Sequence, residues 1–302
     1  MDNRSEVRDF LVTRRARISP ADVGLPDDGT HRRVPGLRRR EVADLSGVSI
    51  EYYIRLERGN LTGVSAGVLD AVARALRLTD AERTYLHDLA RAQGPARRRA
   101  SRRPQRVRPE VQATLDAFTG GPAFVRNGRM DVLAANLLGR AVYAQVFEDP
   151  VTPPNLARYL FLDPRAHDFY DDWDRAADDN VAILRSHAGR DPHDPDLATL
   201  VGTLATRSED FLQRWAAHDV KAHYTGKKHF HHPLVGDLQL TYQELDLFAE
   251  HGLSILVYTP QPGTGTDQSL HLLASWAATQ EAEVGSDSPR PTETGRASSG
   301  PL

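Results

Sequence analysis

The sequence predicts two domains of different fold class: an all-α domain of five short helices, followed by an α+β domain. Apolar residues recur at helical spacing through residues 1–93, whereas parts of the second half alternate apolar and polar side chains as strands do. The formal charge changes at the same place, from +9 over residues 1–108 to −12 over residues 109–302. A chain of 302 residues is long enough for two separate cores.

The all-α domain is expected over residues 1–93. Helices are predicted over residues 6–17, 65–76 and 80–93, and two more over residues 37–59. Ser65 begins one of these helices and Thr79 precedes another, and at both positions a hydroxyl can accept a hydrogen bond from the first turn. Each helix has an apolar face, so five helices can enclose one core.

Residues 37–59 predict two short helices joined by a tight turn. Gly47 can adopt the positive φ that the turn needs, and Ser49 can cap the second helix. The positions expected to point inward are Leu37, Val42, Ala43, Leu45, Val48, Tyr53 and Leu56. This is a helix-turn-helix pattern, which is compatible with a DNA-reading module or with an ordinary structural hairpin.

Charge favours DNA as the partner of this module. Residues 1–108 contain 23 arginines and no lysine against 14 acidic residues. Arginine binds phosphate through a bidentate fork, and phosphate contacts supply most of the sequence-independent affinity for DNA. A solvated basic face is the alternative, but the coincidence of the charge with the helix-turn-helix favours double-stranded DNA.

The outer face of the second helix is expected to read bases through Ser49, Ile50, Glu51 and Arg55. Arg55 can donate to guanine O6 and N7, Glu51 can accept from cytosine N4, and Ile50 can contact a thymine methyl. Phosphate contacts are expected from Arg38 and Arg39, from Tyr52 unless it packs on the rim, and from Arg32 and Arg33 in the preceding loop.

An arginine-rich linker is expected over residues 94–109. It contains seven arginines between Arg97 and Arg108, and its prolines and like charges oppose a stable helix. We expect a solvated linker, with contact to a minor groove as the alternative.

The α+β domain is expected over residues 110–280, with a disordered tail over residues 281–302. Strands are predicted over residues 123–126 and 129–134 around an Asn127-Gly128 turn, and over residues 237–245 and 254–259. Helices are predicted over residues 110–118, 137–147, 155–161, 164–188, 194–205, 209–217 and 267–278. This order favours an antiparallel sheet with helices inserted between its strands.

Both halves resemble one known family. Residues 24–59, with LTDAERTYLHDLA, resemble the amino-terminal part of MmyB-like transcriptional regulators, which belong to the XRE, or lambda-repressor-like, class. PAFVRNGRMDVLAAN, NLARYLFLDPRAHDFYDDW and HPLVGDLQLTYQEL resemble the family's ligand-binding domain. The resemblance implies a PAS-like second domain and a homodimer on an inverted-repeat operator. By analogy it implies repression rather than activation. Related repressors carry glutamine at several reading positions where this chain has none, so their operators cannot be transferred.

The resemblance also implies a small apolar or fatty-acid-like ligand in the second domain. Candidate pocket residues are Phe124, Leu133, Tyr159, Phe161, Trp173, Leu184, Phe211, Trp215, Leu240 and Leu256, with Arg158, His218 and His232 as polar anchors. The alternative for each is ordinary core, since a domain of this size needs about this many large apolar side chains.

Five histidines between His218 and His232 raise the question of a metal site. Strand alternation places His229 and His231 on one face but His232 on the other, and the chain contains no cysteine. Packing or ligand anchoring suits this pattern better, so no metal is expected.

Enzymatic chemistry is not expected. Residues 63–67 match the spacing of a nucleophile elbow, but no predicted strand precedes Ser65, which is better explained as a helix cap. Gly263 and Gly265 lack the third glycine of a dinucleotide fingerprint. No cofactor other than the ligand is therefore expected. An adaptor without a small-molecule ligand is the alternative function, and a hydrolase is the least favoured.

A cytoplasmic location is expected. The sequence has no cysteine, no signal peptide and no apolar run long enough to span a membrane, so no membrane partner is predicted.

Overall fold

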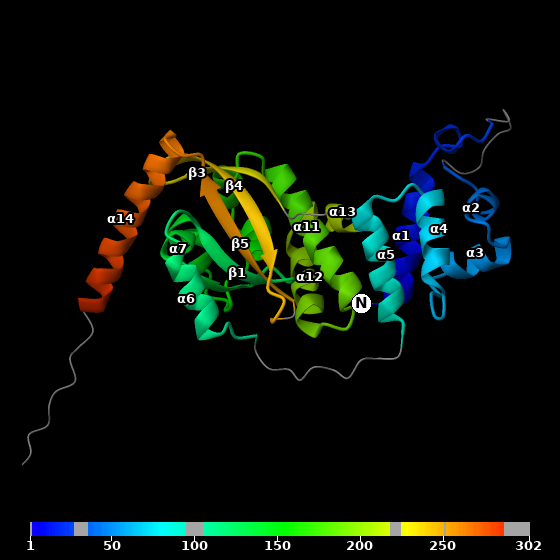
Figure 1. Ribbon diagram of the computed structural model, residues 1–302, viewed down its shortest axis with the longest axis horizontal. Helices are drawn as coiled ribbons and strands as arrows, with labels where there is room; N and C mark the ends of the chain where they lie inside the picture. The colour runs from blue at the N-terminus through cyan, green and yellow to red at the C-terminus, as the bar shows by residue number, and fades with distance from the viewer. Residues whose placement is uncertain (1, 27–35, 95–104, 218–224, 251, 287–302) are drawn as a thin grey trace, which may run out of the picture.

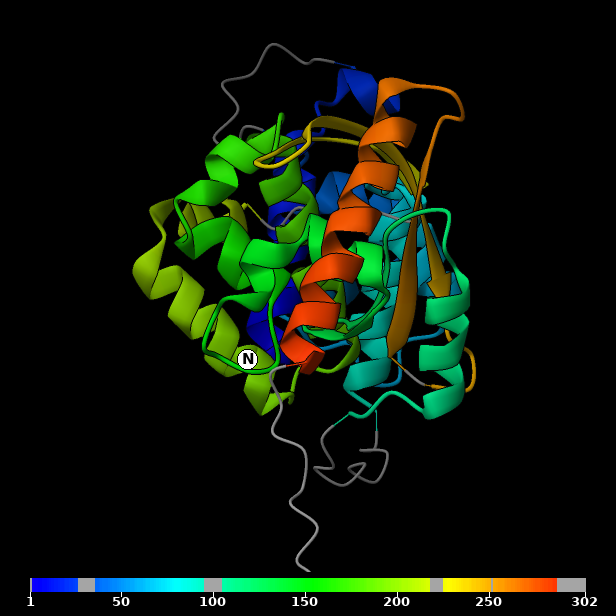
Figure 2. The same ribbon diagram turned by 90° about the vertical axis from the view of Figure 1, so that its left-hand side faces the viewer.

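The computed structural model describes residues 2–26, 36–94, 105–217, 225–250 and 252–286. It contains a helical first domain and a second domain in which helices surround one antiparallel sheet, as the sequence predicts (Figure 1). The first domain and the helix α14 (Gly265–Ser286) lie at opposite ends of the molecule, with the sheet between them (Figures 1 and 2). Within the described ranges, no helix combines the length and apolarity needed to cross a membrane.

The first domain is built from five α-helices and one short 3-10 helix within its described residues. They are α1 (Asn3–Arg17), η1 (Ala21–Val23), α2 (Arg39–Ser46), α3 (Ile50–Glu57), α4 (Ala66–Ala75) and α5 (Asp80–Ala92). Ser65 and Thr79 cap α4 and α5 through hydrogen bonds from Val68 N–H and Glu82 N–H, as predicted. Apolar residues from all five α-helices form one buried core.

The helix-turn-helix is formed by α2 and α3. Gly47 ends α2 at a φ of 67°, and the Ser49 hydroxyl accepts the N–H of Tyr52 at 3.1 Å. Leu45 was predicted to point inward but is 39% exposed. The buried stripe of α2 passes through Val42, Ala43 and Ser46, and Leu45 lies beside this stripe.

The second domain is centred on a five-stranded antiparallel sheet of order β2-β1-β5-β4-β3. The strands are β1 (Ala123–Asn127), β2 (Val132–Ala135), β3 (Thr225–His232), β4 (Gly236–Asp246) and β5 (Leu253–Pro260). The other helices are α6 (Pro109–Ala117), α7 (Leu137–Val142), α8 (Ala144–Phe147), α9 (Leu156–Leu162), α10 (Arg165–Phe169), α11 (Trp173–Arg190), α12 (Pro195–Arg207) and α13 (Glu209–Ala216). Helices with one antiparallel sheet form the α+β domain that the sequence predicts.

The loop between β1 and β2 differs from the predicted two-residue turn. β2 begins at Val132, and the side-chain oxygen of Asn127 accepts the N–H groups of Arg129 and Asp131 at 2.9 and 3.1 Å. The positive φ falls on Met130, at 70°. Gly128 is needed for a different reason: a Cβ there would lie 2.3 Å from the His187 ring on α11. The glycine therefore permits close helix packing rather than a tight turn.

The helix predicted over residues 164–188 is interrupted. α10 ends at Phe169, and α11 begins at Trp173 after an extended segment. Tyr170 forms an antiparallel bridge with Phe230 of β3, and the N–H of Asp171 donates to the carbonyl of His229 at 3.3 Å. Residues 170–172 therefore leave the helix, and the first two of them pair with the open edge of β3.

The last helix is longer than predicted. α14 extends to Ser286, which is six residues into the segment expected to be a disordered tail. The helix therefore runs past residue 280, and residues 287–302 lie outside the described ranges.

The two domains meet through α5 and α11, which lie side by side (Figure 1). Gly189 of α11 approaches so closely that a Cβ there would lie 2.3 Å from the Tyr85 ring. The fully buried Arg185 of α11 forms an ion pair with Glu6 of α1, and Glu6 also accepts the Tyr85 hydroxyl at 2.6 Å. α11 is thus packed against the sheet domain and the helix-turn-helix domain at once.

Candidate functional site

Three of the predicted base-reading residues, Ser49, Ile50 and Glu51, lie at the amino-terminal end of α3, and Arg55 lies in its last turn. Ser49, Glu51 and Arg55 are exposed, and Ile50 is half-buried against the core of the first domain. A helix whose first turn is exposed in this way can enter a major groove without displacing core side chains. The structure therefore leaves the side chains of Ser49, Glu51 and Arg55 exposed to solvent.

Arg55 is oriented by neighbours of its own domain. One guanidinium N–H donates to the carbonyl of Thr62 at 3.0 Å, and the guanidinium carbon lies 5.7 Å from the centre of the Tyr52 ring. A cation–π contact at such an exposed site contributes about 0.5–1 kcal/mol. Tyr52 thus supports the arginine from a half-buried position, while its predicted phosphate contact stays a prediction.

The predicted phosphate-binding arginines differ in their surroundings. Arg38 is exposed, and its backbone N–H donates to the Glu41 carboxylate at 2.6 Å. Arg39 is half-exposed and is paired with Glu57, which is 2% exposed and also binds the Nε of Arg15 at 2.6 Å. Because Glu57 fixes one edge of the Arg39 guanidinium, the other edge is the one available to a phosphate.

Two predicted groups lie outside the described residues. They are Arg32 and Arg33 in the loop before α2, and His218 in the segment before β3. Residues 95–104 of the arginine-rich linker are outside these ranges as well.

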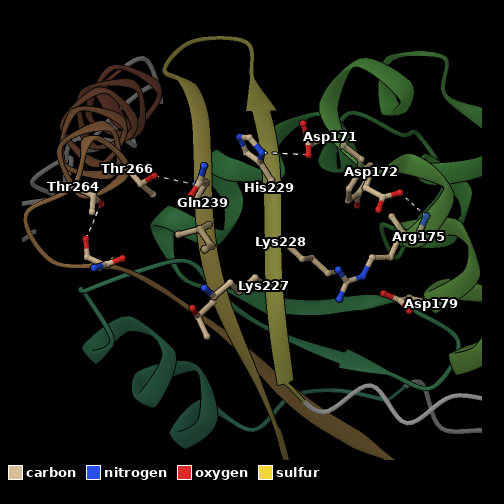
Figure 3. Close-up of a pocket in the computed structure, with 15 residues that line it drawn as sticks. Asp171, Asp172, Arg175, Asp179, Lys227, Lys228, His229, Gln239, Thr264 and Thr266 are labelled. Carbon is tan, nitrogen blue, oxygen red and sulfur yellow. Dashed lines mark hydrogen bonds and ion pairs between the residues drawn. The ribbon is translucent and has the colours of Figure 1, made fainter.

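The second domain contains a cavity of about 330 Å³ between the start of α11, strands β3 and β4, and the start of α14 (Figure 3). Its lining is formed by Tyr170, Asp171, Asp172, Arg175, Ala176, Asp179, Lys227, Lys228, His229, Gln239, Leu240, Thr241, Gln261, Thr264 and Thr266. Charged and polar side chains predominate, and Tyr170, Ala176 and Leu240 add apolar surface. A cavity of this size with a few charged groups can hold a small amphipathic molecule.

Lys228 is a charged residue of this cavity whose pKa is lowered. Burial lowers its pKa to about 8, although the nearby Asp179 carboxylate favours the charged form. The Nζ lies 5.4 Å from the centre of the Tyr242 ring. Arg175 projects from the first turns of α11 toward the same space (Figure 3). Together these two cations can receive an anionic group.

The residues that we predicted to line one ligand pocket lie in several different places. Leu240 lines the cavity, and Leu256 lines an interior space of about 10 Å³ beside Tyr143 and Tyr258. Phe124, Tyr159, Phe161, Leu184 and Phe211 are buried in the main core, with Trp173 and Trp215 half-buried against it. Leu133 lies in a separate cluster with α6 residues. Edge-to-face aromatic contacts, such as Phe161 with Phe211 at 5.1 Å, account for this close packing.

The predicted polar anchors are engaged in structural contacts. His232 is buried, donates from Nε2 to the carbonyl of Ala141 at 3.2 Å, and accepts the N–H of Leu234 at Nδ1. Burial lowers the pKa of its imidazole. Arg158 is paired with Asp149 at 3.0 Å. Both side chains therefore stabilise the fold around the core.

Sequence reasoning missed the charged residues of the cavity. Asp171, Arg175 and Asp179 come from the segment that was predicted as one continuous helix, and Lys228 precedes the histidines that were considered for metal. The aspartates between Asp171 and Asp179 were a visible signal, but their convergence with β3 depends on the break before α11.

Comparison with protein-family models finds a match for each half of the chain. A model described as the MmyB-like transcription regulator ligand binding domain matches residues 107–273, and a helix-turn-helix domain model matches residues 12–86. No curated protein matches the chain.

Proposed function

Because the chain belongs to the MmyB-like transcription regulators, we propose that it is a repressor that binds an inverted-repeat operator as a homodimer and responds to a fatty-acid-like ligand. A helix-turn-helix domain and a ligand-binding domain make it a DNA-binding transcription regulator. Repression, dimerisation and the ligand class are the proposal.

The exposed start of α3 supports the DNA-reading part of the proposal. Arg55 is exposed and oriented by Thr62, so it can donate to a guanine without losing a buried contact. Losing one bidentate base contact costs about 1–3 kcal/mol, which is about 5–150-fold in affinity.

The corresponding test is duplex binding after selection from a random-sequence library. Arg55→Ala is expected to weaken binding and to relax the base preference at one position. Arg8→Ala removes the same charge from the exposed face of α1 and is the control, because it should leave the preference unchanged. Binding that shows no sequence preference in the parent protein would contradict operator recognition and favour an adaptor.

The cavity supports an amphipathic anion as the ligand. Lys228 and Arg175 can receive a carboxylate, while Tyr170, Ala176 and Leu240 can contact an alkyl chain. Loss of one charge-assisted contact costs about 1.5–3 kcal/mol, which corresponds to about 10–150-fold in affinity.

Dodecanoate is a suitable probe for this site. We expect it to bind the purified protein in calorimetric titration and to bind at least tenfold more weakly to Lys228→Gln. Arg207→Gln, which removes an exposed charge at the end of α12, is the matched control. Equal affinity in all three proteins would remove Lys228 from the ligand site, and repeated absence of binding by any acyl compound would remove the ligand class.

The position of helix α11 supports the proposal that the ligand controls DNA binding. Arg175 lines the cavity, and Arg185 lies ten residues further along the same helix in the contact with Glu6 of the first domain. At 1.5 Å per residue the two positions are about 15 Å apart along a rigid element. A ligand that shifts the start of α11 would therefore alter how the first domain is held, provided that it binds one arrangement better than the other.

Operator affinity measured with and without dodecanoate tests this coupling. We expect a change of about 5–150-fold, the range of typical coupling free energies. Analytical ultracentrifugation with operator DNA tests the dimer. An unchanged affinity at saturating dodecanoate would refute the coupling, and one monomer per operator would refute paired reading.

A further inference from the structure

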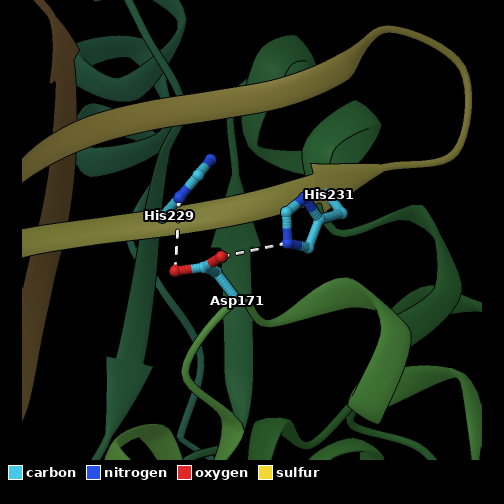
Figure 4. Close-up of side chains that lie close together, drawn as sticks. All are labelled: Asp171, His229 and His231. Carbon is cyan, nitrogen blue, oxygen red and sulfur yellow. Dashed lines mark hydrogen bonds and ion pairs between the residues drawn. The ribbon is translucent and has the colours of Figure 1, made fainter.

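Two histidines and one aspartate converge at the outer edge of the sheet. His229 and His231 lie two residues apart on β3, and Asp171 comes from the extended segment before α11 (Figure 4). One ligand atom from each residue can be chosen so that all three lie within 4.8 Å of one another. In the sequence only the histidines lie close together, because Asp171 is 58 residues away from His229 in the chain.

We propose that Asp171, His229 and His231 bind a divalent transition metal ion, and we name Zn²⁺ as the ion to test first. Imidazole nitrogen and carboxylate oxygen are its usual ligands where thiolate is absent. The proposal does not rest on the regulatory function above, since it concerns the chemistry of three side chains only.

Distances within the cluster fit a coordination sphere. The Asp171 carboxylate oxygens lie 3.3 Å from Nδ1 of His229 and 3.1 Å from Nε2 of His231. Ligands about 2.0–2.1 Å from a tetrahedral zinc ion lie about 3.3 Å from one another. These two distances involve different oxygens of Asp171, and the three ligand atoms lie within 4.8 Å of one another, so the side chains would draw together by up to about 1.5 Å to share one ion.

A second carboxylate orients His231. Asp237 of β4 is its cross-strand neighbour, and its carboxylate lies 2.7 Å from Nδ1 of His231. A proton on Nδ1 that is held by Asp237 leaves the lone pair of Nε2 directed toward Asp171. This carboxylate–histidine arrangement is the usual outer-shell support of a metal-bound imidazole.

The backbone holds the aspartate in register with the strand. Tyr170 is bridged to Phe230, which lies between the two histidines, and the N–H of Asp171 donates to the carbonyl of His229. The three cluster residues and Asp237 thus sit on paired backbone segments. Such preorganisation reduces the entropy lost when an ion binds.

Charge favours a divalent cation at this position. With both imidazoles neutral, Asp171 and Asp237 carry two negative charges, which one Zn²⁺ would balance. The side chains of Asp171, His229 and His231 are 46%, 28% and 45% exposed, so an ion can enter from solvent. Asp171 and His229 also line the cavity, and an ion there would keep open positions for water or a ligand group.

The test uses the full chain without an affinity tag, treated with a chelator and titrated calorimetrically with Zn²⁺. We expect one equivalent to bind, and Co²⁺ substitution to give the visible absorption of a low-coordinate site. His229→Ala and His231→Ala should each lose this stoichiometric binding. Asp237→Asn should retain the stoichiometry but bind about 10–100-fold more weakly.

His271→Ala is the matched control, because His271 is 83% exposed on α14. It should bind Zn²⁺ as the parent protein does. Circular dichroism and thermal unfolding of each metal-free variant establish that it is folded. Absence of a stoichiometric ion in the parent protein, or unchanged binding in folded His229→Ala and His231→Ala, would overturn the proposal.

Discussion

Gly189 provides a direct test of how the two domains are joined. A Cβ at this position would lie 2.3 Å from Cε2 and 2.7 Å from Cδ2 of Tyr85. The Tyr85 ring cannot easily move away, because it is 2% exposed, packs edge-on against Phe10 at 5.2 Å, and donates its hydroxyl to Glu6 at 2.6 Å. Gly189→Ala should therefore force α11 and α5 apart.

The magnitude follows from comparison with a second helical glycine. Gly202 lies on the exposed face of α12, where a Cβ would meet no atom within 4 Å. Gly202→Ala should stabilise the protein by about 0.5–1 kcal/mol through helix propensity alone. Gly189→Ala has at most the same gain but adds an overpacking cost of about 1–3 kcal/mol. The two variants should therefore differ by about 1–3 kcal/mol.

Differential scanning calorimetry of the full chain measures this difference. For a domain of this size it corresponds to a separation of about 2–12 °C in Tm, with Gly189→Ala the less stable. The same variant should reduce the effect of dodecanoate on operator affinity while retaining dodecanoate binding. If Gly189→Ala is stabilised as much as Gly202→Ala and transmits the ligand effect unchanged, then the contact between α5 and α11 does not join the domains as described.

Three further predictions concern ionisable side chains. Glu57→Ala should destabilise the first domain by about 3–5 kcal/mol in urea denaturation, because Arg15, 10% exposed, loses its carboxylate partner; a loss under 1 kcal/mol would contradict a structural ion pair. Burial lowers the pKa of His232, so the unfolded chain binds a proton before the folded protein does as the pH falls below about 6.5. The parent protein should therefore lose more unfolding free energy between about pH 7.5 and about pH 5.5 than His232→Gln. Equal losses in the two proteins would contradict a lowered pKa of His232 in the folded state. Because the pKa of Lys228 is about 8, dodecanoate affinity should fall as the pH rises from about 7 to about 9 and should be flat in Lys228→Gln; parallel curves would place the carboxylate elsewhere.

The five α-helices of the first domain could be predicted closely from sequence, although α1 begins at Asn3 rather than at Glu6 and Leu45 is exposed. Its helices are marked by local signals, such as the caps Ser49, Ser65 and Thr79 and the positive φ of Gly47, which act within one turn of the chain. The buried pair of Arg15 and Glu57 escaped notice because its partners are 42 residues apart. Burial of a charged side chain depends on a partner that local periodicity does not reveal.

Sequence by itself therefore determined the two domains, the helix-turn-helix, the outward face of α3 and the family. The tertiary structure decided where the chemistry of the second domain lies. Residues 164–188 have helical periodicity throughout, but pairing of Tyr170 with the free edge of β3 breaks the helix and brings Asp171 and Arg175 beside Lys228 and His229. Local propensity is worth a fraction of a kcal/mol per residue, so tertiary pairing and burial outweigh it here.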